Sequence, residues 1–174
     1  MQNLKGGTGH ITALNVDELW QMDVFDLSKY STNNDNYKYI FAVVDVFSRK
    51  AWVVPMKKQD KNETTEALQE IITSNNNRPP RSVMGDNASV YNSDVFNELL
   101  DKYKMSSNLN VLNDHHALGI IDNFAKRLKT VFTKYYIRFK TKEWITIMHL
   151  VVSNFNDSEN MSLNHLTPNQ ARLP

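Results

Sequence analysis

The chain of 174 residues contains no cysteine, which excludes disulfide frameworks and cysteine-ligated zinc fingers. No apolar run approaches the ~20 residues that a membrane-spanning helix needs, so we expect no membrane-spanning helix. The opening "MQNLKGGTGHITAL" has no long apolar stretch, so a signal peptide is not expected either. We therefore predict an intracellular protein, neither secreted nor membrane-bound. The chain also has almost no excess of charge of either sign, because 20 Lys and Arg residues are balanced by 19 Asp and Glu residues. Any nucleic acid would need a local basic surface.

What is present is the composition of one globular domain. Apolar residues make up 41% and charged residues 22%, and the length is sufficient for one sizeable core. Residues 1–16 are polar and contain the glycine-rich "GGTGH", which predicts a flexible leader or the remnant of a linker. Residues 17–174 are expected to form the single folded domain.

Three segments rich in bulky and β-branched residues, 18–28, 37–48 and 51–56, predict three consecutive strands. Short polar turns join these segments, which is typical of an antiparallel meander. Apolar side chains occupy both faces of the strands. We therefore expect the sheet to be covered on both sides.

The rest of the chain alternates helical and strand-like patterns. First come a helix at 60–75 with Asn62 as its cap, a short strand within 81–89, and a helix at 94–104 capped by Ser93. Next come a short strand at 110–113, a helix from 117 to about 136, a helix at 142–156 capped by Thr141, and a last turn opened by Thr167 and Pro168. This order predicts an α/β fold with a mixed five-stranded sheet and helices on both faces.

Three aspartates lie in or beside apolar segments, where carboxylates are uncommon. Asp23 lies within the strand-like "LWQMDVFDL", Asp86 follows the apolar "SVMG", and Asp122 shares a helical face with Ile121 and Ala125. Buried acids are costly unless they are paired, hydrogen-bonded or bound to a metal. Carboxylate oxygens are ligands that Mg²⁺ prefers, so three of them from distant segments predict a site for one or two ions.

A single aspartate at a strand end or helix start more often caps a helix or forms a turn. Asp26 leads into a turn and Asp45 precedes another, so both are assigned structural or supporting roles. The combination of the other three is more specific. Asp86 and Asp122 are separated by 35 residues (122 − 86 − 1).

At this spacing the chain resembles the catalytic core of retroviral-type integrases, in the DDE transposase group. Five segments carry the resemblance in order: "LWQMDVFDLS", "YKYIFAVVDVFSRKAWVVPM", "GDNASVYNSDVFNELL", "HHALGIIDNFAKRLK" and "NFNDSENMSLNHLTPNQA". It begins near Glu18 and continues to the C-terminus. The resemblance implies an RNase H-like fold and a polynucleotidyl transferase that processes DNA 3′ ends and joins them to a target strand. It implies that Asp23, Asp86 and Asp122 are catalytic ligands of one or two Mg²⁺ or Mn²⁺ ions.

The chain departs from the family pattern at two places. The third acid, usually Glu, is Asp122, whose side chain is one methylene shorter. After Asp86, Ala88 replaces a usual glycine and Val90 replaces a usual acid. Three alternatives therefore stay open. They are a weak or inactive relative that binds DNA or dimerises, a nuclease that cuts without joining, and a structural domain whose three aspartates lie far apart.

Cationic residues follow the third acid. Lys126 and Lys129 lie four and seven residues after it, on the same helical face, and Arg127 lies between them. Beside a metal site, we assign these three residues and Asn87 to phosphate contacts with DNA. The scattered histidines, including His115, do not predict a zinc site.

The resemblance also implies partners. These are element ends and target DNA, a homodimer or higher oligomer, and no membrane. It further implies flanking zinc-binding and C-terminal DNA-binding domains outside this chain, and a location in a host nucleus or viral particle.

Overall fold

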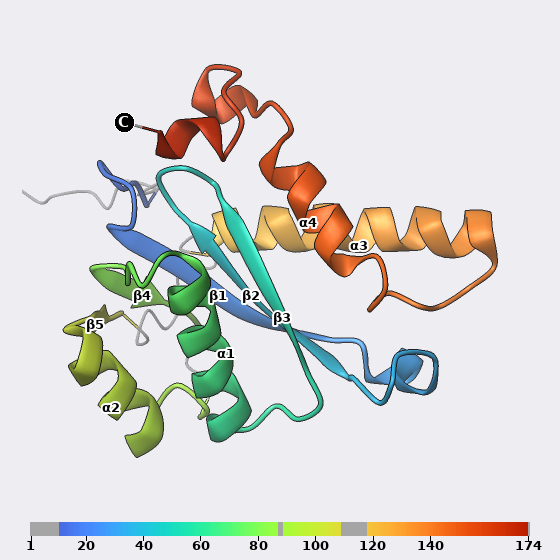
Figure 1. Cartoon of the computed structure of the whole chain (residues 1–174), viewed down its shortest axis with the longest axis horizontal. Coiled ribbons are helices and arrows are strands. Elements are labelled where there is room, and N and C mark those ends of the chain that lie inside the picture. The colour runs from blue at the N-terminus through green and yellow to red at the C-terminus, as the bar shows by residue number, and fades with distance from the viewer. Residues whose placement is uncertain (1–10, 87–88, 109–117, 174) are drawn as a thin grey trace, which may run out of the picture.

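The computed structural model describes residues 11–86, 89–108 and 118–173, which surround a five-stranded sheet (Figure 1). The strands are β1 (Leu19–Asp26), β2 (Tyr39–Asp45), β3 (Ala51–Met56), β4 (Ser82–Met84) and β5 (Ser106–Ser107). Their order is β3-β2-β1-β4-β5. Strands β1 to β3 are antiparallel, whereas β4 is parallel to β1 and β5 is parallel to β4. The predicted antiparallel meander followed by parallel strands is confirmed.

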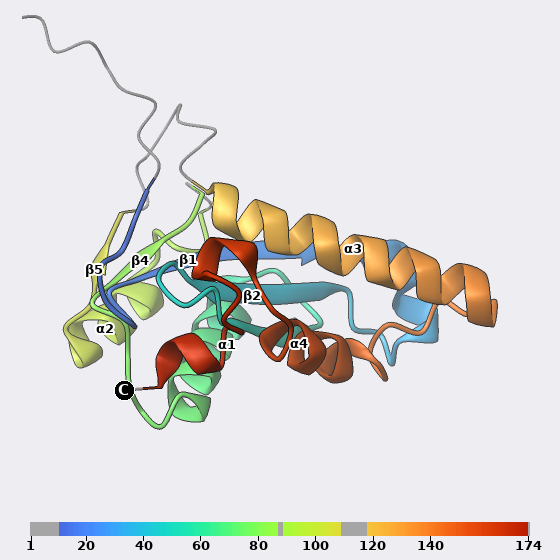
Figure 2. The ribbon, with the colours of Figure 1, turned by 90° about the horizontal axis from the view of Figure 1, so that it is seen from above.

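Helices cover both faces of the sheet, as the apolar pattern of the strands predicts. They are α1 (Lys61–Ser74), α2 (Asp94–Tyr103), α3 (Gly119–Phe139) and α4 (Met148–Asn156). Figure 2 shows α3 on one side of the sheet and α1 with α2 on the other. Helix α4 packs along β3 and joins the same buried cluster as α3.

Strand β1 distributes its side chains between the two cores. Trp20 and Met22 belong to the cluster beneath α1 and α2, and Phe25 belongs to the cluster beneath α3. Because side chains alternate along a strand, Gln21 and Asp23 share the face of Phe25. The predicted acid of β1 is therefore on the face that α3 covers.

Of the helix caps predicted for α1 and α2, the cap of α2 is confirmed and the cap of α1 is wrong. Ser93 caps α2, because its hydroxyl accepts a hydrogen bond from the Phe96 amide at 3.3 Å. The cap of α1 is Asp60 and not Asn62, since Asp60 Oδ1 accepts from the amides of Asn62 and Glu63 at 3.0 and 2.9 Å. Asn62 is already inside the first turn.

The helix predicted at 142–156 begins six residues late, at Met148, and Thr141 does not cap it. The preceding segment is held by Asn34, whose Oδ1 accepts from the amides of Trp144 and Ile145 at 2.7 and 2.9 Å. Trp144 and Met148 are both fully buried. Their helical spacing is therefore a packing pattern that a non-helical segment shares.

Other helix and turn boundaries differ from the predicted ones for local reasons. Helix α3 continues to Phe139 and ends where Lys140 adopts a left-handed φ of 52°. The polar turn predicted after β1 contains a 3₁₀ helix, η1 (Ser28–Asn33). Short 3₁₀ turns η2 (Met161–Leu163) and η3 (Gln170–Arg172) close the chain. The strand predicted at 110–113 lies outside the described residues, and β5 precedes it.

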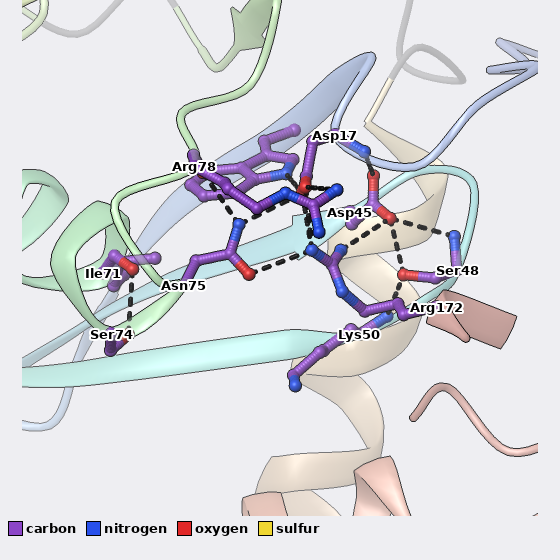
Figure 3. A network of polar contacts seen from close by, with 10 residues as sticks. Asp17, Asp45, Ser48, Lys50, Ile71, Ser74, Asn75, Arg78 and Arg172 are labelled. Carbon is purple, nitrogen blue, oxygen red and sulfur yellow. Dashed lines mark hydrogen bonds and ion pairs between the residues drawn. The ribbon is translucent and has the colours of Figure 1, made fainter. Parts of the chain in front are cut away.

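The last turn forms as predicted and is tied to the sheet. Thr167 Oγ1 accepts from the Gln170 amide at 3.1 Å, and Gln170 Oε1 accepts from the Thr167 amide at 2.9 Å. Arg172 then reaches the sheet (Figure 3), where it donates to Asp17 at 2.8 Å and to Asp45 at 3.2 Å. Both aspartates are buried, and Arg172 forms an ion pair with each of them.

Asp45 has the structural role assigned to it. It accepts from the Ser48 amide at 3.1 Å and from Arg172, and it is fully buried. Burial raises the pKa of Asp45, while the Ser48 and Arg172 contacts lower it. Asp26 accepts from the Ser28 amide at 2.8 Å and so forms the predicted turn.

Among the described residues, no helix has the length and apolar character to span a bilayer.

Candidate active site

Asp23 occupies the middle of β1 on the face covered by α3. Its partner across β2 is Ala42, whose small side chain leaves the carboxylate uncrowded on that side. Asp23 Oδ1 accepts from the amide of Val24 at 2.8 Å. The side chain is half-buried, which places a carboxylate at the edge of an apolar core.

Asp86 is brought to the same place by strand pairing. The parallel register of β1 and β4 ends at the pair Gln21 and Met84. Two further steps along both chains bring Asp86 level with Asp23. The ladder itself ends at Met84, and a continuation of its register, with parallel neighbours ≈ 4.8 Å apart, would set the second acid beside the first. The Asp86 side chain is exposed.

The glycine between β4 and Asp86 has a steric reason. A Cβ atom on Gly85 would lie 3.0 Å from Cε2 of Tyr91, which is tighter than most real contacts. Tyr91 is only 1% exposed and cannot move outward without opening the core. A side chain at position 85 would therefore displace the turn that carries Asp86.

Asp122 is in the first turn of α3, and a hydrogen bond to β1 holds this turn in place. Gln21 Oε1 accepts from the Ile121 amide at 3.0 Å, and this contact is buried. It fixes the start of α3 two residues away from Asp23 along β1. Ile121 and Ala125 are buried as predicted, whereas Asp122 is exposed and lies at the border of the apolar face.

Gln21 is the positioning residue that the sequence analysis missed. It is 1% exposed, in a strand where the neighbouring side chains are apolar. A buried amide needs hydrogen-bond partners from outside its own strand, because strand backbone groups are already paired. The signal was available in "LWQMD", but the sequence does not identify which segment supplies the partner.

Asp86 and Asp122 both act on the charge of Asp23. The pKa of Asp23 is raised from 3.8 to about 6, first by burial and then by the carboxylates of Asp86 and Asp122. The Val24 amide and Lys129 oppose this shift. Burial also raises the pKa of Tyr91 well above its usual value, with further contributions from Asp23 and Asp86. Both of the other predicted acids thus lie near enough to Asp23 to act on its charge.

The donor set suits a hard divalent cation. Within residues 11–86, 89–108 and 118–173, no three acid or histidine side chains already form a metal-ligand cluster. Mg²⁺ is commonly held by only one or two carboxylates, with waters and substrate phosphates completing its shell. Asp23 is half-buried and has two negative neighbours, and across the described chain it forms no ion pair. A divalent cation would relieve this concentration of negative charge.

The predicted phosphate-contact residues divide between the two flanks of α3. Lys129 Nζ lies 5.6 Å from the centre of the Phe25 ring, on the flank of the acids. The Arg127 guanidinium lies 4.6 Å from the centre of the Phe155 ring, on the flank of α4. Lys126 is exposed on the same helix. Asn87 lies outside the described residues.

Comparisons with known proteins agree with this architecture. A putative transposon-derived protein of Caenorhabditis elegans is 27% identical over 137 residues, which cover 79% of this chain and 47% of that protein. The chain thus spans about half the length of that relative. A simian T-cell lymphotropic virus intasome structure, in complex with PP2A regulatory subunit B56 gamma, matches with a TM-score of 0.82 at 17% identity, over 95% of this chain and 58% of that one.

The HTLV-2 integrase catalytic core domain, in complex with magnesium, matches with a TM-score of 0.73 at 21% identity, over 92% of this chain and 99% of that one. These likenesses confirm the RNase H-like fold of integrase cores. A family model described as the integrase core domain matches residues 14–111. This range includes Asp23 and Asp86 and ends before Asp122. Because the match covers more than half of the sequence, the chain belongs to the integrase core domain family.

Proposed function

We propose that this chain is the catalytic core of a DNA integrase that processes 3′ ends and joins them to a target strand. Membership of the integrase core family supports the general class, polynucleotidyl transfer. The observation that carries the specific proposal is the hydrogen bond from the Ile121 amide to Gln21 Oε1 at 3.0 Å, which holds the turn with Asp122 against β1, the strand of Asp23. The raised pKa of Asp23, caused first by burial and then by the carboxylates of Asp86 and Asp122, supports it.

In this proposal Asp23, Asp86 and Asp122 hold one or two Mg²⁺ or Mn²⁺ ions. Bound there, the metal supplies Lewis acidity that activates a water or a 3′ hydroxyl and neutralises charge on the phosphodiester. The chain's own contribution is positioning. The Val24 amide orients the Asp23 carboxylate, and Gln21 fixes the start of α3.

The cations of α3 would position the DNA. Lys126 and Lys129 follow Asp122 by four and seven residues, which is about one and two helical turns. Side chains at this spacing line one face, so a strand lying along α3 would meet both. Phosphate contacts of this kind fix register and orientation without reading sequence.

A labelled DNA substrate with Mg²⁺ or Mn²⁺ tests the proposal. We expect Asp23→Asn and Asp122→Asn to reduce joined product at least ~100-fold, because each removes a ligand charge from the reacting site. Asp26→Asn is the matched control: Asp26 is exposed on the same strand and only caps a turn. Joined product that is equal in the wild type and Asp122→Asn would remove Asp122 from the ligand set.

A second candidate is a DNA-binding relative that joins strands poorly. The observation that favours it is the third acid, which is exposed, short and beyond the range matched by the family model. Product analysis separates the candidates. Joined strands support the integrase, cleaved but unjoined strands indicate a nuclease, and metal-independent binding without cleavage indicates the DNA-binding relative.

We further propose that this chain binds element ends and target DNA and assembles at least as a dimer, in a nucleus or a viral particle. The support is the kind of protein it resembles. One structural neighbour is described as an intasome, and the HTLV-2 core is described in dimeric and trimeric forms. Sedimentation of the chain with and without DNA tests the assembly.

A further inference from the structure

A cavity of about 340 Å³ lies on the flank of α3 away from Phe25 and Lys129, between this helix, the β2–β3 turn and the segment after α4. Its polar lining consists of Arg49, Asn123, Lys126, Arg127, Asn160 and Ser162. No carboxylate contributes to the described lining. Three cationic side chains around one cavity without an acid form a site that suits an anion.

These cations have no acidic side chain in direct contact within the part of the chain that the structure describes. Arg49, Lys126 and Arg127 form no ion pair there. Arg49 is only partly exposed, and burial lowers its pKa while Asp45 raises it. A desolvated guanidinium without a direct acidic partner is stabilised by any anion that enters the cavity.

The backbone conformation of Arg49 makes glycine a suitable replacement at this position. Its φ is 62°, a left-handed conformation that glycine or asparagine adopts more readily. The turn closes there, because the Arg49 amide donates to the Asp45 carbonyl at 2.8 Å. Arg49→Gly therefore removes the cation without adding backbone strain.

Arg127 is held ready on the opposite wall. Its guanidinium stacks over Phe155, and Phe155 in turn meets Phe124 edge-on with ring centres 4.9 Å apart. Stacking of this kind restrains the guanidinium without using its N–H donors. Those donors stay available for an oxygen-rich anion, such as a phosphate.

We propose that this cavity binds a backbone phosphate of DNA, with Arg49 and Arg127 as its principal ligands. The inference rests on the proposed function, which makes DNA the substrate. Lys126 links the two regions, since it lines the cavity and lies one helical turn after Asp122. A DNA strand that leaves the acids across α3 would therefore reach the cavity next.

The test uses Arg49→Gly in the full 174-residue chain, because this variant separates binding from folding. Removing the cation should weaken the affinity for a short DNA duplex about three- to tenfold at low salt. It should also lower the slope of log affinity against log salt by about 0.9, the value for one lost phosphate contact. The melting temperature should stay equal or rise, because glycine relieves the left-handed backbone.

Two variants frame this result. Lys58→Gln is the control, since Lys58 is exposed and does not line the cavity; its salt slope should equal the wild-type value. Arg49→Lys keeps the charge and should recover most of the affinity. An unchanged slope in Arg49→Gly overturns the inference. So does a change in sedimentation mass without DNA, which would make this face an interface between copies.

The inference and the proposed function can fail separately. If Asp23→Asn still joins strands while Arg49→Gly loses affinity and slope, the proposed catalytic site is wrong and the phosphate site stands. If Asp23→Asn is inactive while Arg49→Gly has the wild-type slope, only the phosphate site is wrong. Inorganic phosphate at about 10 mM should compete with DNA, and it should reduce the DNA affinity of Arg49→Gly less than that of the wild type. An equal reduction in both proteins would overturn the proposed phosphate site.

Discussion

Asp23 should cost the apo protein stability at neutral pH. Its pKa is about 6 in the fold and near 3.8 in the unfolded chain, so folding disfavours the ionised form. This penalty is absent below pH ~4, grows between the two pKa values and is complete above pH ~7. We predict that Asp23→Asn raises the free energy of unfolding by roughly 1–3 kcal/mol at pH 8 and changes it little at pH 4.

Denaturant unfolding in the presence of a chelator, at both pH values, measures this difference. Mg²⁺ should then stabilise the wild type at pH 8 and leave Asp23→Asn nearly unchanged, because a ligand that binds only the fold stabilises it. A variant less stable than the wild type at pH 8 without metal would contradict the burial and repulsion assigned to Asp23.

Asp122 should tolerate the longer acid. The side chain is exposed, so Asp122→Glu meets no packed neighbours that must move, and the ligand type is unchanged. We predict strand-transfer rates within about tenfold of the wild type for Asp122→Glu, against a loss of at least ~100-fold for Asp122→Asn. Single-turnover assays provide the comparison. Equal losses in both variants would show that geometry and not charge is essential there.

Single residues were predictable where chemistry limits the choice. The reasoning that a carboxylate is costly in an apolar segment applies to the half-buried Asp23, whereas Asp86 and Asp122 are exposed. Gln21 and Arg49 were not predictable, because their roles depend on the segments that fold against them. The α3 amide that Gln21 accepts from lies 100 residues away in sequence.

At the scale of elements, the contact between β1 and α3 is the most informative. Gln21→Met keeps the length of the side chain and removes the oxygen that accepts from the Ile121 amide at 3.0 Å. We predict a loss of about 1–3 kcal/mol in the free energy of unfolding, because a buried donor loses its partner. Strand transfer should fall as well, since the turn that carries Asp122 is no longer fixed.

Gln59→Met is the matched substitution, because Gln59 is exposed just before α1. Its effect on unfolding should stay within about 0.5 kcal/mol. Denaturant curves and strand-transfer assays on both variants supply the measurement. Equal stability in Gln21→Met and the wild type would mean that the contact does not hold α3.

Element boundaries were predictable where local sequence decides them. Residues 51–56 form a strand and Ser93 caps a helix, as the pattern indicates. The start of α4 was not predictable, because Asn34 takes the amides of Trp144 and Ile145 from 110 and 111 residues away. Periodicity reports which side chains are buried, and a segment held by such a distant contact can be buried at helical spacing without being helical.

At the scale of the whole molecule, Arg172 joins the end of the described chain to its beginning. It contacts Asp17, Asp45 and Asn75 (Figure 3), and it lies 5.2 Å over the ring of Trp52. Arg172→Met removes the ion pairs of both buried aspartates except the one between Asp17 and the exposed Arg78. We predict a loss of roughly 3–5 kcal/mol in the free energy of unfolding at pH 7.

Arg81→Met provides the comparison, because Arg81 is exposed. Its cost should be below about 1 kcal/mol. Calorimetry or denaturant unfolding measures both variants. Equal costs for the two variants would show that the buried network contributes no specific stability.

The mixed sheet was predictable because a meander is followed by alternating helices and strands, whereas the placement of β4 beside β1 was not predicted. The covering of both faces of the sheet was predictable because apolar residues occupy both odd and even positions along the strands. The proximity of the three acids did not follow from sequence pattern alone. It depends on the β1–β4 register, on Gly85 beside Tyr91 and on the Gln21 contact with α3.

The central claim is that Asp23, Asp86 and Asp122 form one metal-binding catalytic site. A crystal structure with Mn²⁺, located by its anomalous scattering, tests this claim most directly. We predict an ion at about 2.0–2.3 Å from a carboxylate oxygen of Asp23 and of at least one of the other two acids, with waters completing its shell. Mn²⁺ bound elsewhere, with these three carboxylates free of metal at saturating concentration, would contradict the account.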